Sequence, residues 1–263
     1  MTKDNQVEQK KTLKRVASAS FIGNFVEWFD YAAYGFLATV IAVVFFPQSD
    51  PLTALMAAYA IFAISFILRP LGGIFWGHVG DKFGRKNALS WSIILMTLAT
   101  VCIALLPSYQ SIGIFAPILL LVFRMIQGFS ASGEYAGAAN FLAEYAPKKK
   151  RGLYTSLVPA STAAGLLLGS VMAAAMFAFM SEAFLHEYGW RIPFLLAAPL
   201  GLIGYYIRVK LEDTPEFLEH QKTGQKENFP IKALFNQYRP ALFKAFAVAS
   251  LNATAFYLSL IHI

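Results

Sequence analysis

Two carboxylates stand one helical turn apart in a segment that is otherwise strongly apolar. The segment runs from Val16 to Phe46, and its central polar residues are Asn24, Glu27, Asp30, Tyr31 and Tyr34. At 100° per residue, these five side chains fall within an arc of about 120° on one helix face. The spacing predicts that this face is turned toward other helices and away from lipid.

A second polar face follows in the apolar stretch Ile112–Tyr145. It carries Arg124, Gln127 and Glu134, which share an arc of about 80° on a helix. The planar guanidinium of Arg124 suits either a carboxylate of the first span or the carboxylate of a solute, and the sequence leaves both interpretations open.

Ionisable groups at membrane depth are rare because each costs a few kcal/mol, and those that persist usually face a cavity, a partner or a transport path. On this ground Glu27 and Asp30 are candidate functional residues. Arg69 and Glu134 are candidates for a charge network, and the remaining polar candidates are Asn24, Tyr34, Arg124 and Gln127. The alternative for each is a purely structural hydrogen bond or ion pair between helices.

The composition requires lipid to cover the surface. Hydrophobic residues make up 57% and charged residues 14% of the chain, whereas soluble domains carry about 25% charged residues. The net charge of +7 comes from residues in short loops between apolar runs, so it does not indicate nucleic-acid binding. With one cysteine and no metal-ligand or nucleotide-binding motif, the chain is not expected to be an enzyme or to hold a metal or cofactor.

Six apolar segments are long enough to cross a bilayer, which takes about 20 helical residues. They are Val16–Phe46, Leu52–Val79, Ala88–Leu106, Ile112–Tyr145, Leu153–Met180 and Ile192–Ile207, and Leu242–Leu260 begins a seventh. The polar stretch before Val16 lacks a signal-peptide cleavage site, so we expect the first span to be retained. The chain ends inside the seventh span, so we expect a complete version to continue.

The orientation follows from the basic residues. Of the 22 lysines and arginines, 19 lie before the first span, after the second and fourth, or in the region that follows the sixth. The opposite loops hold only Arg191. Because Lys and Arg accumulate in cytoplasmic loops, the N-terminus and the segment 212–240 are predicted to be cytoplasmic.

The loop after the second span carries the most specific motif. The string Gly77-His78-Val79-Gly80-Asp81-Lys82-Phe83-Gly84-Arg85-Lys86 resembles the G-x-x-x-D-[RK]-x-G-R-[RK] motif of the major facilitator superfamily. The resemblance implies that Gly77, Asp81, Gly84, Arg85 and Lys86 belong to a cytoplasmic gate. Arg124-x-x-Gln127-Gly128 and the segment Leu211–Phe217 resemble further motifs of the superfamily in their expected places.

A narrower resemblance covers the chain from about Arg15 to Phe217. Gly23–Asp30 with Tyr34-Gly35, then Gly128–Ser130, Gly133–Tyr135 and Tyr188–Phe194 are similar to the metabolite:proton symporter family, most of all to its proline/betaine transporters. The resemblance implies an all-α membrane protein: the six-helix N-terminal bundle of a twelve-helix fold, plus the start of helix 7. The implied domains are 1–211, a linker 212–240 and the partial second half 241–263.

The same resemblance implies a proton-coupled symporter in a bacterial inner membrane. In such a symporter Glu27 and Asp30 are the candidate proton-coupling residues, and the candidate solute-binding residues are Asn24, Tyr34, Arg124 and Gln127. The expected partners are lipids, the C-terminal half and a small zwitterionic solute such as proline or glycine betaine. One alternative is an organic-acid symporter for an anionic metabolite of the oxoglutarate, citrate or shikimate type, and a more remote one is a membrane sensor that does not transport. Alone, the N-terminal half is expected to leave the Arg124 face unpaired, toward lipid or a second copy.

Overall fold

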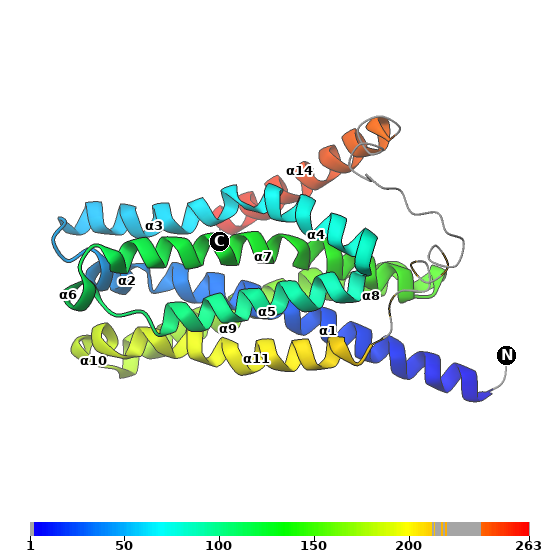
Figure 1. Cartoon of the computed structure of the whole chain (residues 1–263), viewed down its shortest axis with the longest axis horizontal. Helices are drawn as coiled ribbons and strands as arrows, with labels where there is room; N and C mark the ends of the chain where they lie inside the picture. Colours follow the sequence, from blue (N-terminus) through cyan, green and yellow to red (C-terminus); the bar gives the residue numbers. More distant parts are fainter. Residues whose placement is uncertain (1–2, 212, 214–216, 218, 220–237, 263) are drawn as a thin grey trace. The chain divides into compact units, whose positions relative to one another are not determined.

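The computed structural model describes residues 3–211, 213, 217, 219 and 238–262 (Figure 1). These residues fall into two compact units, Met1–Lys222 and Thr223–Ile263, which we describe separately. Most of the predicted linker 212–240 and much of the motif Leu211–Phe217 lie outside the described residues. The boundaries expected between the domains therefore stay predictions.

The first unit is built from long helices that run back and forth along one axis (Figure 1). The long helices are α1 (Lys3–Phe36), α3 (Pro51–Ile67), α4 (Arg69–Phe83), α5 (Arg85–Ala104), α7 (Phe115–Tyr145), α9 (Leu157–Phe179) and α11 (Ile192–Val209). Shorter helices at the turns are α2 (Ala38–Phe45), α6 (Tyr109–Ile112), α8 (Arg151–Thr155) and α10 (Glu182–Glu187). Within the described residues five helical stretches can cross a membrane, or six if α1 and α2 form one bent span. This confirms the predicted all-α bundle.

The first predicted span is bent where the sequence suggested a continuous helix, and the second is interrupted beside Arg69 and Pro70, in the stretch where the sequence predicts a kink. The first bends by 66° between α1 and α2 at Leu37. The second is interrupted at Leu68, between α3 and α4. Pro70 explains the second break, because it lacks a backbone N–H and is tolerated only in the first turn of a helix.

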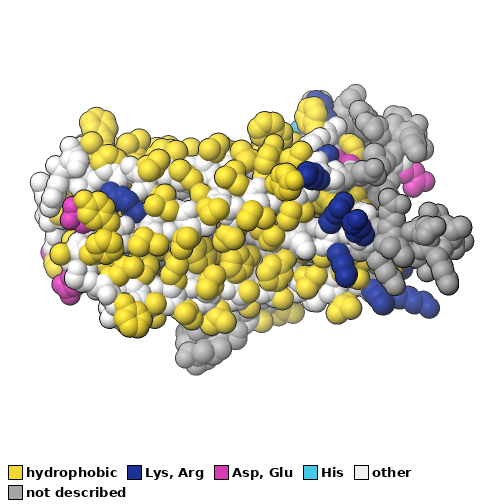
Figure 2. All heavy atoms as spheres, turned by 90° about the horizontal axis from the view of Figure 1, so that it is seen from below, with side chains coloured by type: hydrophobic (Ala, Val, Ile, Leu, Met, Phe, Trp, Pro, Cys, Tyr) yellow, Lys and Arg dark blue, Asp and Glu magenta, His cyan; other side chains and the backbone are white. Residues whose placement is uncertain are grey.

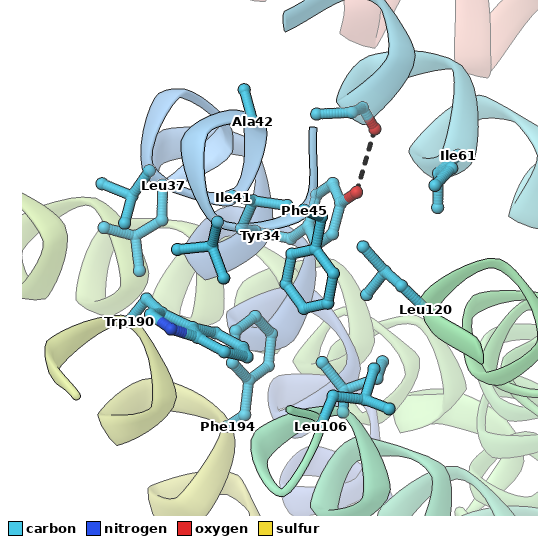
Figure 3. Close-up of a cluster of buried hydrophobic side chains, with 14 of the residues drawn as sticks. Tyr34, Leu37, Ile41, Ala42, Phe45, Ile61, Leu106, Leu120, Trp190 and Phe194 are labelled. Atoms are coloured by element: carbon cyan, nitrogen blue, oxygen red, sulfur yellow. Dashed lines mark hydrogen bonds between the residues drawn. The ribbon is translucent and has the colours of Figure 1, made fainter. Parts of the chain in front are cut away.

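The bend at Leu37 turns α2 into an apolar cluster at one end of the bundle (Figure 3). Phe45 meets the indole of Trp190 edge to face, with ring centroids 5.4 Å apart. Tyr34 donates a hydrogen bond of 2.9 Å from its hydroxyl to the carbonyl oxygen of Ala58, which joins α1 to α3. Burying these large rings stabilises the end of the bundle that lies opposite the basic loops.

Hydrophobic side chains cover the long flank of the protein that Figure 2 displays, while Lys and Arg side chains gather mainly at one end. Exposed apolar residues include Met56, Leu71, Trp91, Leu167 and Phe177. So much exposed apolar surface requires lipid contact. The chain is a multi-pass membrane protein, and the cytoplasmic orientation of its basic end stays a prediction.

The second unit contains α14 (Arg239–His262), where the sequence predicts the start of a seventh span. Its apolar side chains Phe243, Phe246 and Leu251 are each at least two-thirds exposed. Such a helix needs lipid or another helix to cover it.

Candidate functional site: three buried ion pairs

The polar stripe of α1 lies inside the bundle, as the helical spacing predicts. Asn24, Glu27 and Asp30 are each at most 3% exposed. The Asn24 side-chain amide donates to Ser161 Oγ and Thr162 Oγ1, both at 2.8 Å, and so joins α1 to α9. Ser161 and Thr162 were not among the candidate residues identified from the sequence. Two consecutive hydroxyl residues in an apolar helix are the signal that could have identified them.

Asp30 and Arg124 form the central ion pair. Arg124 Nη1 donates to Asp30 Oδ2 at 2.7 Å, and the arginine side chain is fully buried. The Gln127 amide donates to Asp30 Oδ1 at 3.2 Å and to Thr100 Oγ1 at 2.6 Å. Of the two interpretations left open for Arg124, the structure displays pairing with a first-span carboxylate, while contact with a solute stays a prediction.

The guanidinium of Arg124 is only partly used by this pair. Its Cζ lies 3.7 Å from the centroid of the Tyr34 ring, a cation–π contact. Its Nε and Nη2 atoms are buried and have no hydrogen-bond partner among the described residues. Leaving buried charged donors unpaired costs free energy, so their presence marks a place where an acceptor can bind.

Glu27 pairs with Arg69, which lies at the break between α3 and α4. Arg69 Nη2 donates to Glu27 Oε1 at 2.5 Å. The arginine side chain is 24% exposed, whereas the glutamate is 1% exposed. Arg69, a candidate for a charge network, therefore forms an ion pair with Glu27, a candidate proton-coupling residue.

The third pair involves Arg208, which directly follows the predicted sixth span Ile192–Ile207. Arg208 lies in the last turn of α11, is 2% exposed and pairs with Glu134. It also donates to the carbonyl oxygens of Leu89 and Ala19, at 2.8 and 3.1 Å, while Ser92 donates to Glu134 at 3.3 Å. Four helices therefore meet at one guanidinium, which indicates an architectural role.

These pairings also correct the expectation that a half bundle leaves its charges facing lipid. Asp30 and Arg124 neutralise each other within the first unit, as do Glu134 and Arg208. Each ion escapes the cost of being unpaired in hydrocarbon, which is several kcal/mol.

The predicted gate motif lies at the basic end of the bundle. Gly84 joins α4 to α5 with φ +102°, a conformation that favours glycine. Arg85 pairs with Glu144 of α7 at 2.9 Å. Asp81 is exposed and lines a cavity of about 310 Å³ between α4, α5 and α7, together with Gly77 and Arg85.

Asp213 lies within the motif segment Leu211–Phe217 but was assigned no role from the sequence. Its carboxylate accepts hydrogen bonds from the backbone N–H groups of Arg85 and Lys86, at 3.0 and 3.2 Å, so it caps the start of α5. Tyr145 donates from its hydroxyl to the Asp213 carbonyl at 2.9 Å. An acidic residue soon after a span that ends at the basic face is the signal that could have found it.

Within the described part of the chain, no group of three or more His, Cys, Asp or Glu side chains could hold a metal ion. What the bundle contains is a row of paired charges on α1, α4, α7 and α11, inside a surface that lipid must cover. A polytopic helical bundle with ionisable side chains near its middle is the architecture of secondary transporters.

Comparison with known proteins agrees with this class. The family model described as sugar (and other) transporter matches residues 16–233. The chain belongs to this family of the major facilitator superfamily, and the relatives found are transporters, not enzymes.

Two relatives with similar sequences are bacterial transporters. The chain is 48% identical to the proline/betaine transporter of Escherichia coli K12 over 208 residues, 79% of this chain and 42% of that protein. It is 47% identical to the glycine betaine/proline/ectoine/pipecolic acid transporter of Dickeya dadantii over 222 residues, 84% of this chain and 44% of that protein. The chain thus spans less than half the length of either relative.

The fold is similar to that of the xylose transporter of E. coli in a partially occluded inward-open conformation. The TM-score is 0.71 at 20% identity, with 80% of this chain and 51% of that chain covered. A proton:xylose symporter bound to a halogenated glucose gives 0.72 at 18% identity, with 81% and 47% covered. At such identities the likeness concerns the fold alone.

Proposed function

We propose that this chain forms the N-terminal half of a proton-coupled symporter that imports a compatible solute such as proline or glycine betaine. The observation that carries the proposal is the buried pair of Asp30 and Arg124, in a chain 48% identical to a proline/betaine transporter. The coupling ion, the solute, the pairing with a second half and the cytoplasmic orientation of the N-terminus all belong to the proposal.

The pair suggests how proton and solute binding are linked. When Asp30 takes up a proton, the attraction that holds Arg124 to it is lost. Arg124 then has Nη1 as well as the unpartnered Nε and Nη2 to offer a solute carboxylate, in the two-pronged geometry that arginine favours. Glu27 serves as a second proton acceptor one helical turn away, where Arg69 competes with the proton for the carboxylate.

The other predicted residues have separate tasks in this proposal. Gln127 orients Asp30 through its hydrogen bond, and the Tyr34 ring holds the guanidinium of Arg124 through a cation–π contact. Asp81, Arg85 and Lys86 belong to the cytoplasmic gate, whose ion pairs must break when the two halves of a transporter rock against each other.

The free donors of Arg124 equally suit an organic acid, which keeps the second candidate function open. In that case Arg124 holds a carboxylate of the substrate and no cation site is needed. Competition of labelled uptake by glycine betaine against oxoglutarate, citrate and shikimate separates the two functions.

The test is uptake by the full chain co-expressed with the second half of the E. coli proline/betaine transporter, in cells that lack other carriers. Accumulation of labelled proline or betaine, abolished by a protonophore, is expected. Compared at equal amounts of membrane-inserted protein, Glu27→Gln and Asp30→Asn should remove the protonophore-sensitive part of the accumulation, whereas the exposed Glu182→Gln should not. Accumulation that is unchanged by both substitutions and by the protonophore would contradict proton coupling. Expressed without the second half, the chain should not accumulate the solute.

A further inference from the structure

The guanidinium of Arg69 lies against two aromatic rings as well as a carboxylate. Its Cζ is 5.0 Å from the centroid of the Tyr31 ring and 4.7 Å from that of Phe66. The two centroids are 5.5 Å apart, and the rings are inclined by 29°. The three distances form a nearly equilateral triangle, so the cation contacts both rings, while Glu27 binds it from α1.

Such a combination recognises alkylated ammonium groups. A quaternary ammonium has no N–H to donate, so it is held by the faces of aromatic rings and by nearby negative charge. Two rings and the carboxylate of Glu27 supply both here. Arg69 places a cation of its own chain in the position that a solute cation would take.

Arg69 can leave this position more easily than the other buried arginines. Its side chain is 24% exposed, compared with 2% for Arg208 and none for Arg124. It is also the first residue of α4, directly after the helix break at Leu68. A side chain at a helix terminus has fewer neighbours to displace when it swings aside.

Glu27 gives an independent sign of a ligand. Its second oxygen, Oε2, is buried and has no hydrogen-bond partner among the described residues, and the side chain is 1% exposed. A buried carboxylate needs a counter-charge, so departure of Arg69 must be matched by another cation or by a proton.

Aromatic side chains connect the surroundings of Arg69 to those of Arg124, whose Cζ lies 5.9 Å from the centroid of the Phe62 ring. Phe62 contacts the rings of both Tyr31 and Tyr34, with centroids 5.7 and 5.5 Å apart, so one aromatic wall extends from the Arg69 position to the Arg124 position. Glu27 and Asp30 are three residues apart on α1, and residues at this spacing on a helix have their Cβ atoms about 5–6 Å apart. This separation suits a small zwitterion whose two charges are a few bonds apart.

We propose that Tyr31 and Phe66, together with Glu27, form the subsite for the alkylated ammonium group of the solute, and that Arg69 occupies this subsite in the conformation described here. The inference rests on the proposed function and adds the part of the site that selects the cationic end. Binding of the solute then displaces Arg69, as proton binding displaces Arg124 from Asp30.

The test uses the full chain co-expressed with the second half of the E. coli relative. The KM for uptake is measured with glycine betaine and with its less methylated analogue dimethylglycine. Phe66→Leu should raise the KM for betaine about thirtyfold, the size of a lost cation–π contact in a desolvated site, and should weaken the preference for betaine. Phe66→Tyr keeps the ring face and should retain both the KM and the preference. Phe177→Leu, on the exposed side of α9, is the control.

The outcomes separate the two proposals. If Phe66→Leu impairs insertion, Phe66→Met replaces it, because methionine keeps the apolar volume without an aromatic face. A KM that changes equally for both solutes, or a change in maximal rate alone, overturns the cation subsite while leaving the proposed function intact. If the wild-type pair of halves accumulates neither solute, the proposed function itself fails, and the subsite with it.

Discussion

Asp30 of α1 and Arg124 of α7 are joined by a hydrogen-bonded ion pair of 2.7 Å, although 94 residues separate them in the chain. Gln127 holds the second carboxylate oxygen from the same face of α7. The charges therefore neutralise each other inside the first unit, and the pair links α1 to α7.

Removing one charge of this pair should destabilise the bundle strongly. Asp30→Asn leaves the buried Arg124 without its counter-charge, which costs about 3–5 kcal/mol. Adding Arg124→Gln should recover most of the loss, because no isolated charge remains. Equilibrium unfolding in mixed micelles measures both effects, and strictly additive losses in the double variant would argue against the pair.

Gly23 should accept a side chain only at a cost in stability, because the two side chains that a Cβ would meet are held in a buried ion pair. A Cβ at this position would collide with the Arg208 guanidinium and the Glu134 carboxylate. Gly23→Ala is expected to destabilise the protein by about 1–3 kcal/mol, as overpacking of a filled core does. Gly35→Ala on the same helix is the matched control, since no heavy atom lies within 4 Å of its Cβ position. Equal stability of the two variants would show that the side chains of Arg208 and Glu134 can shift to make room for the added methyl group.

The cap that Asp213 provides should protect the start of α5. Asp213→Ala removes the acceptor for the N–H groups of Arg85 and Lys86, and loss of such a cap costs about 0.5–2 kcal/mol. Asp213→Asn keeps an acceptor oxygen and should cost less. Hydrogen exchange of these two amides reports the difference, and unchanged protection in Asp213→Ala would contradict the capping role.

Asp50 should give the turn before α3 a dependence on pH. Hydrogen bonding from Thr53, through its side chain and its backbone N–H, lowers the pKa of the Asp50 carboxyl below its ordinary value of 3.8. Because the folded turn binds the proton less readily than the open one, the cap is fully formed above pH 3.8 and is lost as the pH falls through the lower, folded pKa.

Exchange of the Thr53 amide across this acid range measures the effect. The wild-type turn should lose protection of this amide as the pH falls. Asp50→Asn should keep a constant cap, since the amide does not titrate. Identical pH profiles for the two proteins would exclude Asp50 as the titrating group.

The sequence by itself determined the local part of this structure. Apolar runs of about 20 residues fixed the spans, because hydrocarbon leaves the backbone no partner except its own helix. The helical period placed Asn24, Glu27 and Asp30 on one buried face, since that pattern depends only on the geometry of α1. The same local rules set the all-α class and the basic end.

Only the tertiary structure decided which charges meet. Three carboxylates and three arginines permit several pairings, and the observed one joins Arg69 to Glu27, Arg124 to Asp30 and Arg208 to Glu134. Arg208 looks like a cytoplasmic flank in the sequence because its carboxylate partner lies 74 residues away. Hydropathy is a local property, whereas an ion pair depends on which helices pack together, so the pairing emerged only with the packed bundle.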